Sequence, residues 1–292
     1  MSAQLSAFTA HRRLLFDLAY RMLGRVVEAE DVVQDTWLRW QKQDLAAVAS
    51  PKAWLVTTAT RLALDQLRSA RHTRERYYGV WLPEPLVEAP GRSPAESTAL
   101  AESLTMAFML MLERLSPDER VVFLLREVFG HDYAEIADIV GKTAPACRQL
   151  ASRARHRLRG AAAPAAAPSE RAERIVRQFF AAMASGQARE ILPLLRDDAV
   201  LLSDGGGRVR SAGRPIRTAD RVSRLFAGLR NRFPDYEHAE FSFATINGRP
   251  GALMFSGGRL FNVYSLDVVG DRIRAIYQIR NPDKLRHLAG PN

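Results

Sequence analysis

The spacing of apolar residues changes character about two thirds of the way along the 292-residue chain. Before residue 195, apolar side chains recur three or four positions apart, as Leu14, Leu18 and Met22 do, which predicts amphipathic helices. After Asp197 the spacing shifts toward two, and strand candidates follow at 238–246, 252–255, 260–269 and 272–279. Helices that precede a run of strands favour an α+β domain, here with a curved antiparallel sheet. We therefore expect a multidomain protein, all-α at first and ending in an α+β cone.

Two stretches of biased composition divide the chain. Residues 160–169 read GAAAPAAAPS, and residues 77–97 contain four prolines and two glycines. We therefore expect helical domains at 1–76 and 98–160 and a third domain at 170–292, with linkers at 77–97 and 161–169. The first linker also contains Tyr77, Tyr78, Trp81 and Leu82, which are too many large apolar side chains for a freely solvated segment. We expect it to pack against something.

Composition excludes several classes of protein. The single cysteine, Cys147, rules out an internal disulfide framework and a cysteine-based metal site. No apolar run approaches the roughly 18–20 residues that span a bilayer, and the start of the chain lacks the order of a signal peptide. The net charge of +10 is compatible with a nucleic-acid partner. We expect a cytoplasmic protein with no membrane partner, no metal and no cofactor.

The stretch AEDVVQDTWLRW, residues 29–40, predicts a helix with two different faces. Val33, Trp37 and Trp40 recur at helical spacing and form an apolar stripe. Asp31 and Asp35 fall on another face, with Gln34 beside them. Two interpretations stay open, which are the solvated side of an ordinary helix and a docking surface for a basic partner.

A second tryptophan-bearing helix follows at 51–68, beginning with the capping pair Ser50-Pro51. Cations project from it and from the basic stretch that comes next, and we expect them to contact phosphates: Lys52, Arg61, Arg68 and Arg71. Trp54 could stack on a base or lie in the core, and the residues alone favour neither.

Residues 133–159 have the spacing of a helix-turn-helix motif. Gly141 allows the sharp turn, and Thr143 caps a helix that has Pro145 in its first turn. From Lys142 to Arg159 there are six lysine and arginine residues and no acidic one, so this helix suits the major groove. The expected contacts are with base edges near its start and with the backbone farther on: Ala144, Pro145, Arg148, Gln149 and Arg153. The alternative is a basic surface helix of a generic bundle.

These motifs, in this order, resemble regions 2 and 4 of bacterial sigma factors of the extracytoplasmic-function type. The resemblance implies that the acidic helix binds the β′ clamp helices of RNA polymerase through Asp31, Gln34, Asp35 and Leu38. It also implies that the helix at 51–68 contacts the promoter −10 element, that the helix-turn-helix reads the −35 element, and that the polymerase β flap is a further partner.

The tail carries two further motifs, DGGGR at 204–208 and NPDKL at 281–285. Both resemble signatures of sigma factors that have a fused SnoaL-like domain, a cone-shaped scaffold with an apolar pocket. The resemblance implies a regulatory contact with the first linker through Trp81, Leu82, Asp204, Gly205, Gly206, Gly207, Arg208, Asn281, Pro282, Asp283, Lys284 and Leu285. Without it, three glycines in a row predict a hairpin turn and nothing more.

Three hypotheses for function follow. The first is an alternative sigma factor that directs promoter recognition and is modulated in cis by its C-terminal domain. The second is a DNA-binding regulator with a ligand-sensing domain, and a small-molecule ligand in the C-terminal pocket fits either. The third is a cyclase-like enzyme, but Asp204, Tyr236, His238 and Asp267 form no recognisable acid/base pair by spacing. We favour the first hypothesis, with no catalytic residues.

Overall fold

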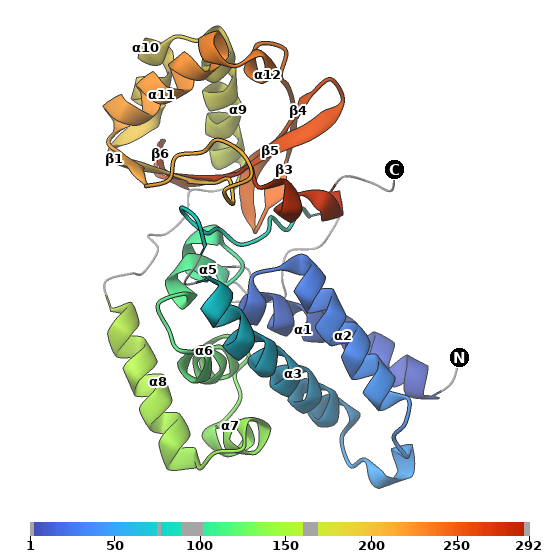
Figure 1. Cartoon of the computed structure of the whole chain (residues 1–292). Coiled ribbons are helices and arrows are strands. Elements are labelled where there is room, and N and C mark those ends of the chain that lie inside the picture. Colours follow the sequence, from blue (N-terminus) through green and yellow to red (C-terminus); the bar gives the residue numbers. More distant parts are fainter. Residues whose placement is uncertain (1–2, 75–76, 89–101, 160–168, 289–292) are drawn as a thin grey trace. The chain divides into compact units, whose positions relative to one another are not determined.

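The computed structural model describes residues 3–74, 77–88, 102–159 and 169–288 of the chain (Figure 1). The chain divides into two compact units. Unit 1 comprises Met1–Arg76 and Ala95–Ala162, and unit 2 comprises Tyr77–Pro94 and Ala163–Asn292. Residues 77–88, which we call the tether, therefore belong with the C-terminal part of the chain. No helix in the described ranges is long and apolar enough to cross a membrane.

The first half of unit 1 is a group of three packed helices. Its elements are α1 (Ala3–Leu23), α2 (Val26–Trp40) and α3 (Pro51–Arg74). The apolar stripes predicted from the sequence face inward, since Leu15, Leu18 and Trp40 are fully buried. The indole of Trp40 donates a hydrogen bond to the carbonyl of Gln4 at 2.9 Å, which fixes the start of α1 against the end of α2.

The second half of unit 1 contains a helix-turn-helix. Its elements are α5 (Met106–Leu112), α6 (Pro117–Phe123), the π-helical turn η2 (Leu124–Val128), α7 (Tyr133–Val140) and α8 (Ala144–Leu158). Within the described residues, the helix expected over 98–115 is interrupted at 103–105 and ends at Leu112. The Thr105 side chain accepts a hydrogen bond from the Phe108 amide and caps the start of α5. Residues 98–101 lie outside the described ranges. Gly141 has a φ of 67° and makes the turn between α7 and α8.

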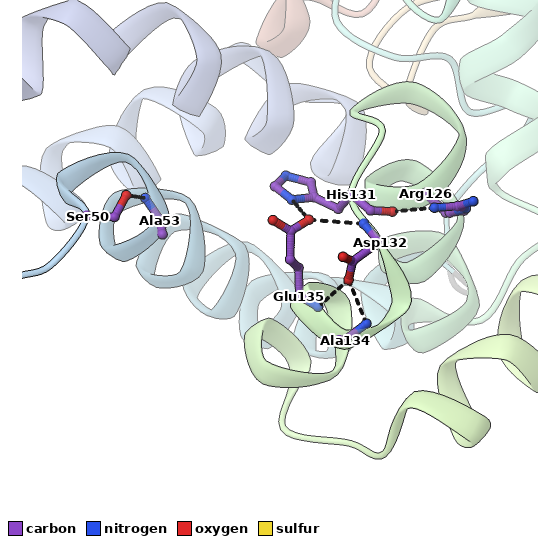
Figure 2. Close-up of polar contacts among 7 residues, drawn as sticks. All are labelled: Ser50, Ala53, Arg126, His131, Asp132, Ala134 and Glu135. Atoms are coloured by element: carbon purple, nitrogen blue, oxygen red, sulfur yellow. Dashed lines mark hydrogen bonds and ion pairs between the residues drawn. The ribbon is translucent and has the colours of Figure 1, made fainter.

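The start of α7 is fixed by a reciprocal capping box, drawn in Figure 2. Asp132 accepts hydrogen bonds from the amides of Ala134 and Glu135, each at 2.8 Å, and Glu135 accepts one from the amide of Asp132 at 3.0 Å. Arg126 donates to the carbonyl of His131 at 3.0 Å. These contacts satisfy amides that the first helical turn leaves free, so the orientation of α7 is set locally. Figure 2 also shows the cap of α3, where the Ser50 hydroxyl accepts a hydrogen bond from the Ala53 amide at 3.3 Å.

Unit 2 is a six-stranded sheet in the order β2-β1-β6-β5-β4-β3. The strands are β1 (Leu195–Asp204), β2 (Ile216–Arg217), β3 (Glu240–Ile246), β4 (Arg249–Ser256), β5 (Arg259–Val269) and β6 (Arg272–Ile279). All pairs are antiparallel except β1 and β6, which are parallel. The expected antiparallel sheet is therefore wrong at this pair, because β1 is separated from β6 by most of the domain and joins it by a crossover rather than a hairpin.

Helices cover one face of this sheet (Figure 1). They are α9 (Ser169–Ser185), α10 (Ala188–Ile191), α11 (Ala219–Arg232) and α12 (Pro234–Glu237). The rings of Phe179, Phe180, Phe226 and Tyr264 fill the space between the helices and the sheet, with centroids of Phe180 and Tyr264 5.3 Å apart. The fold class predicted from the sequence, two helical domains followed by an α+β domain, is confirmed.

Candidate functional site

The acidic face of α2 is exposed. Asp31, Gln34 and Asp35 are all solvent-accessible, and Leu38 beside them is 48% exposed. The opposite face is held in the core, with Val33 and Trp40 buried. The 3.6-residue period of the helix therefore separates a buried face from an exposed face, as the sequence predicts. Leu38 lies on the exposed face together with Asp31 and Asp35.

The cations of α3 contact the second half of unit 1. Arg61 donates to the carbonyls of Asp138 and Ile139, at 2.8 and 2.9 Å, near the end of α7. The carbonyls of a last helical turn lack partners within the helix and carry partial negative charge, so they suit a guanidinium. Arg68 pairs with Asp118 at 2.8 Å.

The other residues expected to contact the −10 element lie as follows. Lys52 is exposed, and Trp54 is half-buried with its ring 5.2 Å from that of Trp40. The ring of Trp54 therefore packs on the core while keeping an open edge. Arg71 belongs to α3, in the stretch whose side chains the structure does not describe.

Asp118, in the first turn of α6, binds two cations at once. Its second oxygen lies 3.0 Å from the amine of Lys142, in the turn of the helix-turn-helix. Partial burial opposes the charged form, but hydrogen bonds from Lys142 and Arg68 outweigh it and lower the pKa of Asp118 below its ordinary value. One carboxylate thus joins α3 to the helix-turn-helix.

The residues expected to read the −35 element lie on the outer side of α8. Pro145, Arg148, Gln149 and Arg153 are exposed, and Ala144 is half-buried. The buried face consists of small and apolar side chains, among them Cys147, Leu150 and Ala154. The start of α8 is capped by Thr143, which accepts from the Ala146 amide at 3.3 Å.

A buried carboxylate orients the far part of α8. Arg153 and Arg157 approach Glu119 at 3.4 and 3.1 Å, and the Glu119 side chain is only 3% exposed. Burial works against ionisation, but hydrogen bonds with Ser116 and the charges of Arg157 and Arg153 lower the pKa of Glu119. The two arginines are therefore held side by side on one edge of the helix.

In unit 2, Asp204 at the end of β1 binds the tether. Its carboxylate accepts hydrogen bonds from the Tyr77 hydroxyl at 2.6 Å and from the Leu82 amide at 2.8 Å, and the residue is fully buried. Its carbonyl accepts from the amides of Arg280 and Asn281. Asp204 thus lies where β1, the tether and the NPDKL segment meet.

Lys284 completes this cluster as a buried cation. Its amine lies 2.7 Å from Asp204 and also donates to the Leu82 carbonyl. The rings of Tyr77 and Trp81 lie 4.9 and 4.4 Å from the amine, so two aromatic faces stabilise the charge. A charge removed from water in this way is tolerated because it is paired and hydrogen-bonded.

Comparison with known proteins agrees with these features. Residues 7–73 match the Sigma-70 region 2 family model, and residues 105–158 match the Sigma-70, region 4 model. The chain is 38% identical over 290 residues to the ECF RNA polymerase sigma factor SigJ of Mycobacterium tuberculosis, covering 96% of this chain and 93% of the relative. The chain belongs to the extracytoplasmic-function sigma factors. As members of this family do, this sigma factor acts in transcription initiation and binds core RNA polymerase and promoter DNA.

Two further comparisons extend over nearly the whole sigma factor. The crystal structure of Mycobacterium tuberculosis SigJ superposes with a TM-score of 0.76 at 36% identity, covering 97% of this chain and 98% of that one. The probable ECF sigma factor SigI of the same organism is 31% identical over 282 residues, with 96% and 94% covered. The similarity therefore includes the C-terminal unit. Sigma factors as a family are regulatory transcription factors rather than enzymes.

The glycines of the DGGGR motif allow this sigma factor's tether to approach closely. Gly206 has a φ of 60°, and a Cβ there would collide with the side chain of Asn281. Asn281, which is buried, donates to the Tyr77 hydroxyl at 2.8 Å. The remaining motif residues lie around this core: Gly205 and Leu285 are buried, Trp81 and Pro282 are half-buried, Gly207 is exposed, and Arg208 reaches Asp283 at 3.3 Å.

Sequence reasoning missed a second set of contacts along the tether. Asn247 lies in the turn after β3. Its side-chain oxygen accepts a hydrogen bond from the Leu86 amide at 2.9 Å, and its backbone amide donates to the Leu86 carbonyl. Val87 bridges to Ile246, and the His287 ring lies 2.9 Å from the Pro85 carbonyl. A single asparagine or histidine gives no pattern, so only the turn at 247–248 could have pointed to this site.

Of the four polar residues considered for catalysis, His238 is exposed and the other three have separate partners. Asp204 binds the tether, whereas Tyr236 bonds to Asn262 and Gln278 among the aromatic rings of the core. The Asp267 carboxylate accepts a hydrogen bond from the Tyr277 hydroxyl at 3.0 Å, and burial raises the pKa of Asp267. Each of these groups is thus occupied with a separate set of neighbours.

Proposed function

We propose that this sigma factor docks on the polymerase β′ clamp helices through α2 and reads the −10 and −35 elements through α3 and α8. In this proposal the β flap is a further contact of region 4, and unit 2 modulates initiation in cis. The exposed acidic face of α2 and the exposed start of α8 support the docking and reading roles. In the interior of unit 2, the Tyr236 hydroxyl accepts hydrogen bonds from both Asn262 and Gln278, so these two donors are not free for a ligand.

The observation that carries the cis role is the bound tether. Residues 77–88 lie in the segment between region 2 and region 4, and both ends of this tether are hydrogen-bonded to the sheet domain, at Asp204 and at Asn247. A free segment of this kind would extend by roughly 3.3–3.6 Å per residue. Binding it to a sheet limits how far the two DNA-reading regions can separate. Release of the tether should therefore change promoter engagement.

This role is tested by replacing residues 204–208 with a neutral two-residue turn. The change removes Asp204 and the glycines that admit Asn281, so the tether should detach and transcription from a cognate promoter should rise. Run-off transcription with purified core polymerase measures this, with residues 1–160 alone as a second arm. The control is Gly228→Ala in α11, where a Cβ meets nothing within 4 Å and φ is not positive. Output equal to that of the unchanged chain would reject modulation through the tether.

We also propose that Asp118 competes with DNA for the cations of both regions. It holds Arg68 of region 2 and Lys142 of region 4, so one carboxylate occupies a cation of each region. A phosphate contact contributes about 0.9 to the slope of log affinity against log salt. In this hypothesis, Arg68 and Lys142 stay on Asp118 when the unchanged chain binds the promoter, and they reach phosphate only when that carboxylate is neutralised.

Asp118→Asn should therefore tighten promoter binding at low salt and steepen the salt slope by about 2. The control, Asp198→Asn, removes the same charge in unit 2, where the carboxylate pairs with Arg196 at 2.9 Å. The pKa of Asp118 is lowered in the folded protein, so the contact is present above its unfolded pKa and is lost as the pH falls through the folded value. Fluorescence anisotropy at several pH values measures both effects. An equal change in the control would assign the result to net charge alone.

A further inference from the structure

The loop between β1 and β2 is strongly basic. Residues 207–217, which we call the arginine loop, read GRVRSAGRPIR and contain four arginines and no acidic residue. All four, Arg208, Arg210, Arg214 and Arg217, are exposed. Within the described residues, only Arg208 of the four has an ion pair, with Asp283. Other exposed arginines of unit 2 are of both kinds: Arg171 pairs with Asp271 and Arg196 with Asp198, whereas Arg189, Arg221 and Arg259 have no ion pair within the described residues.

The arginine loop is held at both ends, so its cations are presented on a defined backbone. The amide of Arg208 donates to the Gly205 carbonyl at 3.0 Å, and the Arg280 guanidinium donates to the Arg210 carbonyl at 2.6 Å. At the other end, Arg217 pairs with Val200 of β1. Anchoring of this kind reduces the conformational entropy lost when a partner is bound.

An exposed aromatic ring lies beside the loop. Tyr78 is 76% exposed, and a Cβ on Gly207 would touch its side chain at 3.4 Å. Exposure of this extent is unusual for a tyrosine whose neighbours Tyr77 and Trp81 are packed on Lys284. A loop with exposed cations that also touches an open ring at Gly207 has the two features that track a nucleic-acid backbone and stack on a base.

We propose that the arginine loop is a third DNA-contacting surface of this sigma factor, which binds the phosphate backbone of promoter DNA. The surface extends DNA binding into unit 2 and rests on the proposed function, which places promoter DNA beside the chain. Arginine suits this role because its guanidinium binds phosphate oxygens in pairs. An acidic protein face, such as that of α2, is the competing partner and is distinguished by the test below.

The test compares the full chain carrying Arg210→Gln, Arg214→Gln and Arg217→Gln with a matched variant. The matched variant carries Arg171→Gln, Arg196→Gln and Arg272→Gln, which removes the same charge from exposed arginines of unit 2 that have acidic partners. The holoenzyme formed with core polymerase binds a labelled promoter fragment over a range of salt concentrations. The loop variant should bind several-fold more weakly and lower the salt slope by about 2–3. The matched variant should change the slope little.

Three outcomes would overturn the proposal. An unchanged slope in the loop variant would mean that these arginines do not contact DNA, and an equal loss in both variants would mean that only net charge matters. An unchanged slope together with tighter binding of core polymerase would assign the loop to the acidic face of α2. Failure of the proposed function is seen separately, because the unchanged holoenzyme would then not transcribe from the promoter at all.

Discussion

Replacing Asp31 and Asp35 by arginine should abolish the binding of core RNA polymerase. Both carboxylates are exposed on one face of α2, and neither has an ion pair within the described part of the chain. Reversing both charges would turn an attraction for a basic clamp helix into a repulsion, and like charges opposed in an interface cost several kcal/mol. At the affinities typical of protein complexes, a loss of this size leaves no detectable complex.

The fold should survive this change, because the buried face of α2 is untouched. Exposed substitutions away from caps and core typically alter stability by about 0.5 kcal/mol or less. The measurement is co-elution with core polymerase on size-exclusion chromatography at low ionic strength, with circular dichroism as the folding control. A double reversal at Glu190 and Glu240, which are exposed in unit 2, alters net charge equally and should still co-elute. Co-elution of the α2 variant would remove α2 as the docking surface.

Leu38 would give the proposed docking surface an apolar contact as well as charge. Its side chain is 48% exposed on the same helix as the two aspartates. An exposed leucine alone needs no explanation, but one that adjoins a charged docking face fits the apolar centre and polar rim of an interface. The helix thus offers the two kinds of contact that a specific protein complex uses.

The faces of the helices were predictable because helical spacing depends on neighbours along the chain. Val33 and Trp40 are buried and Asp31 and Asp35 exposed, as the 3.6-residue period requires. The partners of the cations were not predictable in the same way. Arg61 binds carbonyls near residue 139, and Arg68 binds Asp118, fifty positions away in the sequence. Such contacts depend on how helices pack, which a local pattern does not contain.

In unit 2 the strands were predictable but not all of their pairings. Alternation located β3 to β6 within a few residues, and hairpin turns paired them with their neighbours. The parallel pairing of β1 with β6 joins segments about 75 residues apart and leaves no local signature. The burial of Lys284 was likewise not predictable from the NPDKL motif, because lysine side chains are rarely buried.

Replacing Asp204 by alanine should destabilise unit 2 by about 3–5 kcal/mol, because it leaves the buried charge of Lys284 unpaired. The Tyr77 hydroxyl and the Leu82 amide lose their acceptor in the same change. Adding Lys284→Met removes the orphaned charge and should recover part of the loss. The control is Asp283→Asn, next to Lys284, whose partly exposed carboxylate pairs with Arg208 and Arg286 and should change stability by about 1 kcal/mol or less.

Hydrogen exchange resolves this prediction by region, which matters because two units need not unfold together. Amides of the tether, Leu82 above all, should exchange faster in Asp204→Ala, while those of the α2 and α3 interiors should keep their protection. If the tether stays protected, Asp204 does not hold it, and modulation in cis would need another contact. If the tether is released and transcription is unaltered, the cluster is only structural. The remaining outcome is that Asp204→Ala releases the tether and raises transcription. If adding Lys284→Met to that variant then restores stability but leaves the tether released, the hydrogen bond between Asp204 and Leu82, and not the buried ion pair, links unit 2 to initiation.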